Sequence, residues 1–124
     1  MCKYFLSPKD AIHLNAMILD APSALLSLPL LESALHQPYN GYYESIYAQA
    51  AGIFRSLLMN HCFKDGNKRT ACALLAIFLQ ETNLDLPAND KSIEEFTLSI
   101  IRHPKESQIK YIEQWLETNT MDYI

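Results

Sequence analysis

The residues of this chain that can do chemistry are concentrated in one segment, from His61 to Thr70. Three of the ten Lys and Arg residues of the chain lie within it. Gly66 and Asn67 can adopt the backbone conformations needed where a loop enters a helix, which leaves the first amides of that helix free to bind an anion. The segment therefore suits a phosphate group.

Positive charge gathers at the same place. Lys68 and Arg69 fall in the first turn of the expected helix, where a cation opposes the helix dipole at about 0.3–1 kcal/mol each. Lys64 adds a third positive charge on the loop. Cations in this unfavourable position are easier to explain if a polyphosphate binds between them.

An acid and a histidine accompany this predicted phosphate site. Asp65 offers a hard oxygen ligand, and Mg²⁺ typically takes one or two protein carboxylates while the phosphates of the substrate complete its shell. The natural ligand is therefore a magnesium nucleotide. The imidazole of His61 can accept a proton from a hydroxyl nucleophile at neutral pH, which would make it a general base. Phe63 is expected to bury its ring under the loop and fix the shape of the loop.

Each of these residues also has an ordinary structural explanation. His61 can cap the end of a helix, Asp65-Gly66-Asn67 is a common turn sequence, and Lys64, Lys68 and Arg69 can form a solvated face. The combination of all of them in one segment favours the functional interpretation. The segment lacks the glycine-rich pattern of a P-loop, so an ordinary nucleotide triphosphatase is not supported.

Apolar residues recur at helical spacing along most of the chain, which predicts an all-α domain of about six helices. Ser7-Pro8-Lys9-Asp10 has the pattern of a helix start, with a capping serine, a proline and an acid three residues after the cap. The segment Lys68 to Glu81 is apolar almost all round, so it is expected to be the central helix, with Asn83 as its C-cap. The other helices are expected from Leu28 to His36, from Glu44 to Asn60, from Asn89 or Asp90 up to Pro104 with Ile93, Phe96, Ile100 and Ile101 on its apolar face, and around Ile109, Ile112 and Leu116.

Tyr39-Asn40-Gly41-Tyr42 is the one hairpin signal in the chain. Asn-Gly supplies the positive φ angles of a type I′ turn, and the tyrosines on either side favour strands. The same residues equally suit an ordinary surface loop between two helices. The fold expectation is therefore an all-α domain with a candidate short β-hairpin.

Length and composition limit the remaining options. The 124 residues form one domain over residues 1–124, and 49% hydrophobic against 19% charged residues excludes a disordered chain. A net charge of −4 argues against sequence-independent binding of nucleic acid. The longest wholly apolar run, Ala71 to Leu79, is far shorter than the roughly 20 residues of a membrane span.

The cysteines and the N-terminus predict a cytoplasmic location. Cys2, Cys62 and Cys72 are an odd number at spacings that match neither a disulfide framework nor a zinc motif, which is typical of reduced thiols. The chain reaches Pro8 and its charged neighbours before the core of an export signal could form.

Taken together, these residues resemble the Fic/Doc superfamily, and more closely its Doc (death-on-curing) toxin branch. The resemblance rests on His61, Phe63 and the run Asp65 to Thr70 in this order. It extends upstream to Leu30-Leu35 and Pro38, and downstream through the apolar helix to Asn83. It therefore covers most of the chain and implies a compact Fic-like helical domain.

The resemblance implies a transferase that uses ATP and Mg²⁺. Fic-type enzymes usually transfer AMP from ATP to a protein hydroxyl, whereas Doc-like members bind ATP in the reverse sense and transfer its γ-phosphate to a threonine. This sequence has Lys68 where the AMP-transferring branch has a second glycine, and Cys72 where that branch has a further arginine. A long cation in place of glycine would obstruct the backbone contact with the phosphates that AMP transfer requires. The sequence thus favours a Doc-like protein kinase.

In this interpretation His61 deprotonates the target hydroxyl and Asp65 holds Mg²⁺. Lys68 and Arg69 neutralise the charge that develops on the transferred group. The phosphates are held by the loop amides together with Gly66, Asn67, Lys68, Arg69 and Lys64.

The resemblance also implies protein partners. The target would be a translation elongation factor, elongation factor Tu, whose modification blocks protein synthesis. The candidate hairpin at residues 39–42 occupies the place of the flap that positions the target by strand addition. The sequence has no Ser/Thr-x-x-x-Glu-Gly/Asn inhibitory motif, so restraint is expected from a small antitoxin whose tail folds on the toxin.

Two other functions stay open at this point. The first is AMP transfer by the same base and metal ligand, because Gly66, which some Doc proteins replace, keeps the loop partly Fic-like. The second is a catalytically silent module whose loop only holds a nucleotide or an acidic peptide.

Overall fold

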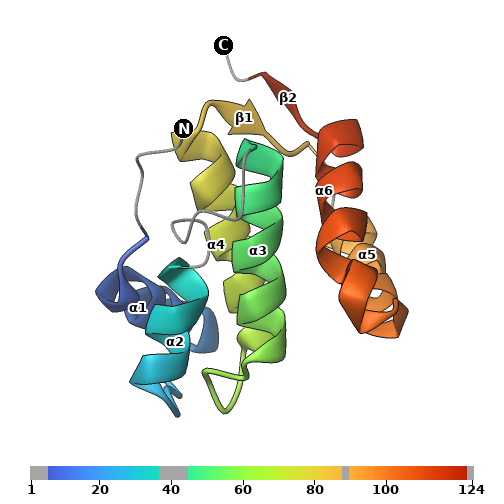
Figure 1. The fold of residues 1–124 in the computed structure, drawn as a ribbon. Helices are drawn as coiled ribbons and strands as arrows, with labels where there is room; N and C mark the ends of the chain where they lie inside the picture. The colour runs from blue at the N-terminus through green and yellow to red at the C-terminus, as the bar shows by residue number, and fades with distance from the viewer. Residues whose placement is uncertain (1–5, 37–44, 88–89, 123–124) are drawn as a thin grey trace.

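The computed structural model describes residues 6–36, 45–87 and 90–122. Within these ranges the chain is helical apart from its connections and one pair of very short strands (Figure 1), which confirms the all-α expectation. The elements are α1 (Pro8–Leu19), α2 (Leu28–His36), α3 (Ile46–Met59), α4 (Asn67–Glu81), β1 (Leu84–Asp85), α5 (Asp90–Arg102), the 3₁₀ turn η2 (Lys105–Ser107), α6 (Gln108–Asn119) and β2 (Met121–Asp122).

Helix α1 begins as its sequence predicts. The Ser7 hydroxyl accepts a hydrogen bond from the Asp10 amide at 3.0 Å, and Pro8 is the first helical residue. The helix ends at Asp20, whose φ of 51° places it in the left-handed region. Left-handed backbone stops a helix, so α1 ends before Pro22 is reached.

Helix α3 occupies the middle of the fold. It packs against α2, α4 and α6, and Figure 1 shows α1 and α2 on one side of it and α5 and α6 on the other. Six consecutive residues, 49–54, are buried, which requires cover on every side of the helix. Helix α4, the expected central helix, packs against α1, α3 and β1. The central position is therefore shared by two helices, because α3 is surrounded at least as completely as α4.

Two local details differ from the sequence expectation, the C-cap of α4 and the exposure of Ile101. Thr82 caps α4, and its hydroxyl donates to the Leu79 carbonyl at 2.9 Å. Asn83 follows with a φ of 66°, a conformation that asparagine tolerates better than most residues. Ile101 is 49% exposed, whereas its neighbour Ile100 is fully buried, so the apolar face of α5 is narrower than expected.

The two strands were not predicted. β1 and β2 pair in antiparallel fashion, with Leu84 opposite Asp122 and Asp85 opposite Met121. Each strand has only two residues, which is too short for the alternating pattern that identifies a strand in a sequence. Their pairing connects the end of α4 to the end of α6.

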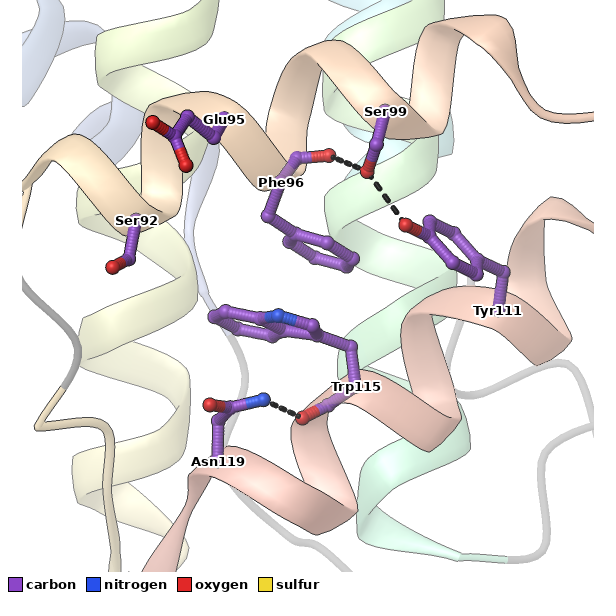
Figure 2. Close-up of a pocket in the computed structure, with 7 residues that line it drawn as sticks. All are labelled: Ser92, Glu95, Phe96, Ser99, Tyr111, Trp115 and Asn119. Atoms are coloured by element: carbon purple, nitrogen blue, oxygen red, sulfur yellow. Dashed lines mark hydrogen bonds between the residues drawn. The ribbon is translucent and has the colours of Figure 1, made fainter.

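An aromatic cluster joins α5 to α6 (Figure 2). The rings of Phe96 and Trp115 stack with centroids 4.0 Å apart, and Tyr111 lies 5.5 Å from Phe96. The hydroxyls of Ser99 and Tyr111 are 2.7 Å apart and hydrogen-bonded. Since α6 in turn packs on α3, this cluster attaches α5 to the core.

The candidate hairpin at residues 39–42 lies outside the described residues, so the flap stays a prediction. Every helix within the described ranges is too short or too polar to cross a membrane.

Candidate active site

The predicted phosphate-binding segment forms the loop between α3 and α4. His61, near its start, has a φ of 48°, and Gly66, at its end, has a φ of 78° and is the N-cap of α4. Left-handed backbone is rare for side chains other than Gly, Asn, Asp and His, so both residue types suit these positions. The two left-handed residues let the chain reverse direction between α3 and α4. The side chain of His61 is exposed.

The connection between α1 and α2 holds this loop by backbone pairing. Phe63 forms an antiparallel bridge with Leu25, and the Lys64 amide donates to the Ala24 carbonyl at 2.7 Å. The Leu26 amide donates to the Cys62 carbonyl at 2.8 Å. These bonds fix the middle of the loop, which lies between the exposed residues at positions 61 and 64.

Phe63 and Cys62 anchor the loop in the core. Phe63 is 2% exposed and Cys62 is 1% exposed, so the expected burial of the Phe63 ring is confirmed. Burial raises the pKa of the Cys62 thiol, which favours the protonated form over the nucleophilic thiolate. Cys62 therefore has a packing role beside His61.

The side chain of Asn67 closes the loop on itself. Its amide nitrogen donates to the Phe63 carbonyl at 2.6 Å, and its oxygen accepts from the Phe63 amide at 3.1 Å. Both polar ends of the side chain are thus engaged with one backbone residue. Asn67 contributes to the site by fixing the loop that leads into α4, and its predicted contact with phosphate would have to come from its backbone amide.

Asn15, which belongs to no motif in the sequence and was not predicted, ties the loop to α1. Asn15 is fully buried, and its amide nitrogen donates to the Asp65 carbonyl and to the Thr70 hydroxyl, at 3.1 Å in each case. Its oxygen accepts from the Ser23 hydroxyl at 2.9 Å and from the Ala24 amide at 3.0 Å. The signal in the sequence was one asparagine four residues after the buried Ala11, on a helix with an otherwise apolar face.

The start of α4 is open and positively charged. Lys64, Lys68 and Arg69 are exposed, and none of them forms an ion pair within the part of the chain that the structure describes. The first turn of α4 has no acidic residue, and the N-cap Gly66 has no side chain to satisfy its amides. The first amides of the helix therefore keep their capacity for an anion. This is the electrostatic arrangement that a polyphosphate requires.

Asp65 is the one acidic residue of the loop. It is exposed, and its Oδ1 accepts a hydrogen bond from the Gly66 amide at 2.7 Å. The described residues contain no group of three His, Cys, Asp or Glu side chains that could hold a metal ion by themselves. A single carboxylate fits an Mg²⁺ ion whose other ligands are nucleotide phosphates and water, and it does not fit a closed metal site.

The exposed residues of the site, His61, Lys64, Asp65, Lys68 and Arg69, line neither of two hollows found elsewhere. One hollow is the groove of Figure 2 between α5 and α6, and the other lies beside Arg55 and Ile109. The loop and the first turn of α4 thus form an open site on which a substrate would have to be bound between charges and amides.

Comparison with known proteins identifies the family. A model of the Fic/DOC family matches residues 5–79, from the segment before α1 through most of α4. No curated protein and no solved structure matches the chain. Because the match covers more than half of the chain and contains the whole loop described above, the chain belongs to the Fic/DOC family and is a transferase of the Fic type that uses a nucleotide substrate.

Proposed function

We propose that this chain is a Doc-like protein kinase toxin. It transfers the γ-phosphate of ATP to a Thr or Ser hydroxyl of elongation factor Tu and so blocks protein synthesis in the cytoplasm. The observation that carries the proposal is Lys68, an exposed cation that is the second residue of α4. The AMP-transferring branch of the family has glycine at the position that Lys68 occupies here.

Lys68 argues for the reverse orientation of the nucleotide. Glycine at the second position of the helix lets phosphates approach the backbone closely, and a lysine side chain occupies that space. The same side chain places a positive charge beside the first helix amides, where it can stabilise a phosphoryl group during its transfer. Arg69, the next residue, adds a second such charge.

Gly66, which keeps the loop partly Fic-like, does not argue against phosphate transfer. A Cβ atom at position 66 would lie 3.1 Å from Asn15 Nδ2 and 3.2 Å from Leu19 Cδ2, and the φ of 78° also disfavours most other residues. The packing of α1 against the loop therefore accounts for this glycine. Its presence carries no information about whether AMP or phosphate is transferred.

The reaction assigns a role to each site residue. His61 accepts the proton of the target hydroxyl while the hydroxyl oxygen forms a bond to the γ-phosphorus; the bond from that phosphorus to the β–γ bridging oxygen breaks, and ADP leaves. Lys68, Arg69 and the helix amides stabilise the negative charge on the phosphates. Asp65 would hold Mg²⁺, which when bound neutralises further phosphate charge. Asn67, through its clamp on Phe63, keeps the loop in shape.

The intact mass of elongation factor Tu tests the proposal. After incubation with this protein, ATP and Mg²⁺, we expect a gain of one phosphate, and we expect no gain with a His61→Ala control. A gain of one AMP would instead make the protein an adenylyltransferase in which Lys68 does not reverse the nucleotide. ATP binding without modification of any target would favour a silent nucleotide-binding module.

A small antitoxin is the expected regulator of this toxin. The connection that pairs with the loop carries Leu26, which is 63% exposed, and the first turn of α2 carries Leu28 and Leu30, each 43% exposed. Exposed apolar side chains beside a catalytic loop suit the apolar face of an amphipathic segment. We expect expression of the protein alone to arrest growth and a small protein to copurify with it from its source cells. Harmless expression together with no copurifying partner would contradict the toxin role.

A further inference from the structure

We infer that Asn15 is a positioning residue of the active site, which holds the Asp65–Gly66 peptide in the orientation that binds the magnesium nucleotide. The inference rests on the proposed function of the loop. Asn15 is on α1, far from the motif in sequence, and its side chain is fully buried against the loop and α4.

The peptide group between Asp65 and Gly66 is hydrogen-bonded at both of its ends. Its carbonyl oxygen accepts from Asn15 Nδ2 at 3.1 Å, and its N–H donates to Asp65 Oδ1 at 2.7 Å. In a trans peptide these two groups point in opposite directions, so the two bonds together fix the plane of the peptide. The orientation of this plane sets where the Asp65 carboxylate and the first amide of the site lie.

Of the two hydrogen bonds to this peptide, the one from Asn15 becomes the more important when the magnesium nucleotide binds. A carboxylate that binds a cation and an amide that binds a phosphate are both drawn away from the hydrogen bond they share in the free protein. The bond from Asn15 to the carbonyl is partly buried and lies on the other side of the peptide, so it survives this exchange. This hydrogen bond therefore keeps the peptide plane in place when the Gly66 N–H leaves the Asp65 carboxylate.

The other bonds of Asn15 make it a rigid support. The second hydrogen of its amide is donated to Thr70, on the first turns of α4, and its oxygen is held by Ser23 and by the Ala24 amide. The Ala24 carbonyl in turn accepts from the Lys64 amide of the loop. Four hydrogen bonds leave the side chain no alternative orientation.

The test compares Asn15→Asp with Ser23→Ala. Asn15→Asp keeps the shape of the side chain and its acceptor oxygen but removes the donor to the Asp65 carbonyl. Asn15→Ala serves as a second variant, because a buried carboxylate can prevent folding. Ser23→Ala is the matched control, since it removes one of the two hydrogen bonds to the Asn15 oxygen and keeps the Ala24 bond and both donor bonds of the same asparagine. Thermal unfolding of each variant establishes that it is folded.

Two readouts are measured on the folded proteins: affinity for ATP with Mg²⁺ by calorimetry, and hydrogen exchange of the amides at residues 66–69 without ligand. We expect folded Asn15 variants to lose about tenfold in affinity or more, as is typical when a residue that orients a metal ligand is removed. Their loop amides should exchange faster than in the wild type. Ser23→Ala should lower the melting temperature and leave both readouts at the wild-type value.

A purely structural role predicts a different result: all variants would lose stability in proportion to the bonds removed, and neither readout would change in the folded protein. That result overturns the inference. If the wild-type protein binds no ATP, the proposed function is wrong independently of Asn15. Hydrogen exchange then tests whether Asn15 positions the loop. Faster exchange in the Asn15 variants alone supports the inference, and unchanged exchange overturns it.

Discussion

Replacing His61 with Asn should lower the rate of group transfer by about 10²–10⁴-fold, the range that a positioned general base supplies. Asparagine cannot take the proton of the target hydroxyl at neutral pH. It does tolerate the left-handed backbone that His61 adopts at a φ of 48°, so the loop should keep its shape. The exposed imidazole makes no packing contribution to the core, and the melting temperature should therefore change little.

The measurement is the initial rate of label transfer from ATP to elongation factor Tu, together with a thermal melt. His13→Asn is the matched control, because His13 is also exposed and lies on α1 outside the loop. It should transfer at the wild-type rate. A folded His61→Asn protein that transfers at the rate of this control would remove His61 from the mechanism.

Helix boundaries could be predicted because the interactions that set them are local. The bond from the Asp10 amide to the Ser7 hydroxyl spans three residues, and the sequence pattern for it is specific. Helix α2 runs from Leu28 to His36 as expected, ending where Pro38 soon follows. The loop residues could likewise be found from the sequence, because they are contiguous.

The support of the loop could not be predicted, because it comes from distant residues. Asn15 and Asp65 are 50 positions apart, and the bridge between Leu25 and Phe63 joins two irregular segments. An asparagine on the buried face of a helix indicates a hydrogen-bonding partner in the core and does not say which one. The role of Asn15 therefore required the fold.

The relative positions of the helices could not be predicted from the spacing of apolar residues either. An apolar pattern all round Lys68 to Glu81 indicates that neighbours cover this helix, and it gives no information on which ones. Helix α3 reads as a helix with a broad buried face, yet its short residues, Ala50, Ala51 and Gly52, are buried and admit close neighbours. The apolar pattern predicts that this broad face is buried and does not say how many helices cover it, which is why α3 was not expected at the centre.

Replacing Lys68 with Gln should separate activity from stability. We expect transfer to fall by about 10²–10³-fold, the effect of removing one preorganised group that stabilises charge in the transition state. The free energy of unfolding should rise by about 0.3–1 kcal/mol, because the lysine is a cation in the first turn of α4 and opposes the helix dipole. Among the residues that the structure describes, no carboxylate pairs with Lys68, so its removal breaks no ion pair. The rates of transfer and urea denaturation curves measure the two effects.

Lys9→Gln is the matched control for this variant. Lys9 is the second residue of α1, as Lys68 is of α4, and it is also exposed. Both substitutions should therefore stabilise the protein by a similar amount, while Lys9→Gln leaves transfer unchanged. If Lys68→Gln kept full transfer, the lysine would be an ordinary surface residue and the kinase proposal would lose its main support. If it stabilised the protein and abolished transfer, the unfavourable position of the cation would be explained by the phosphates it binds.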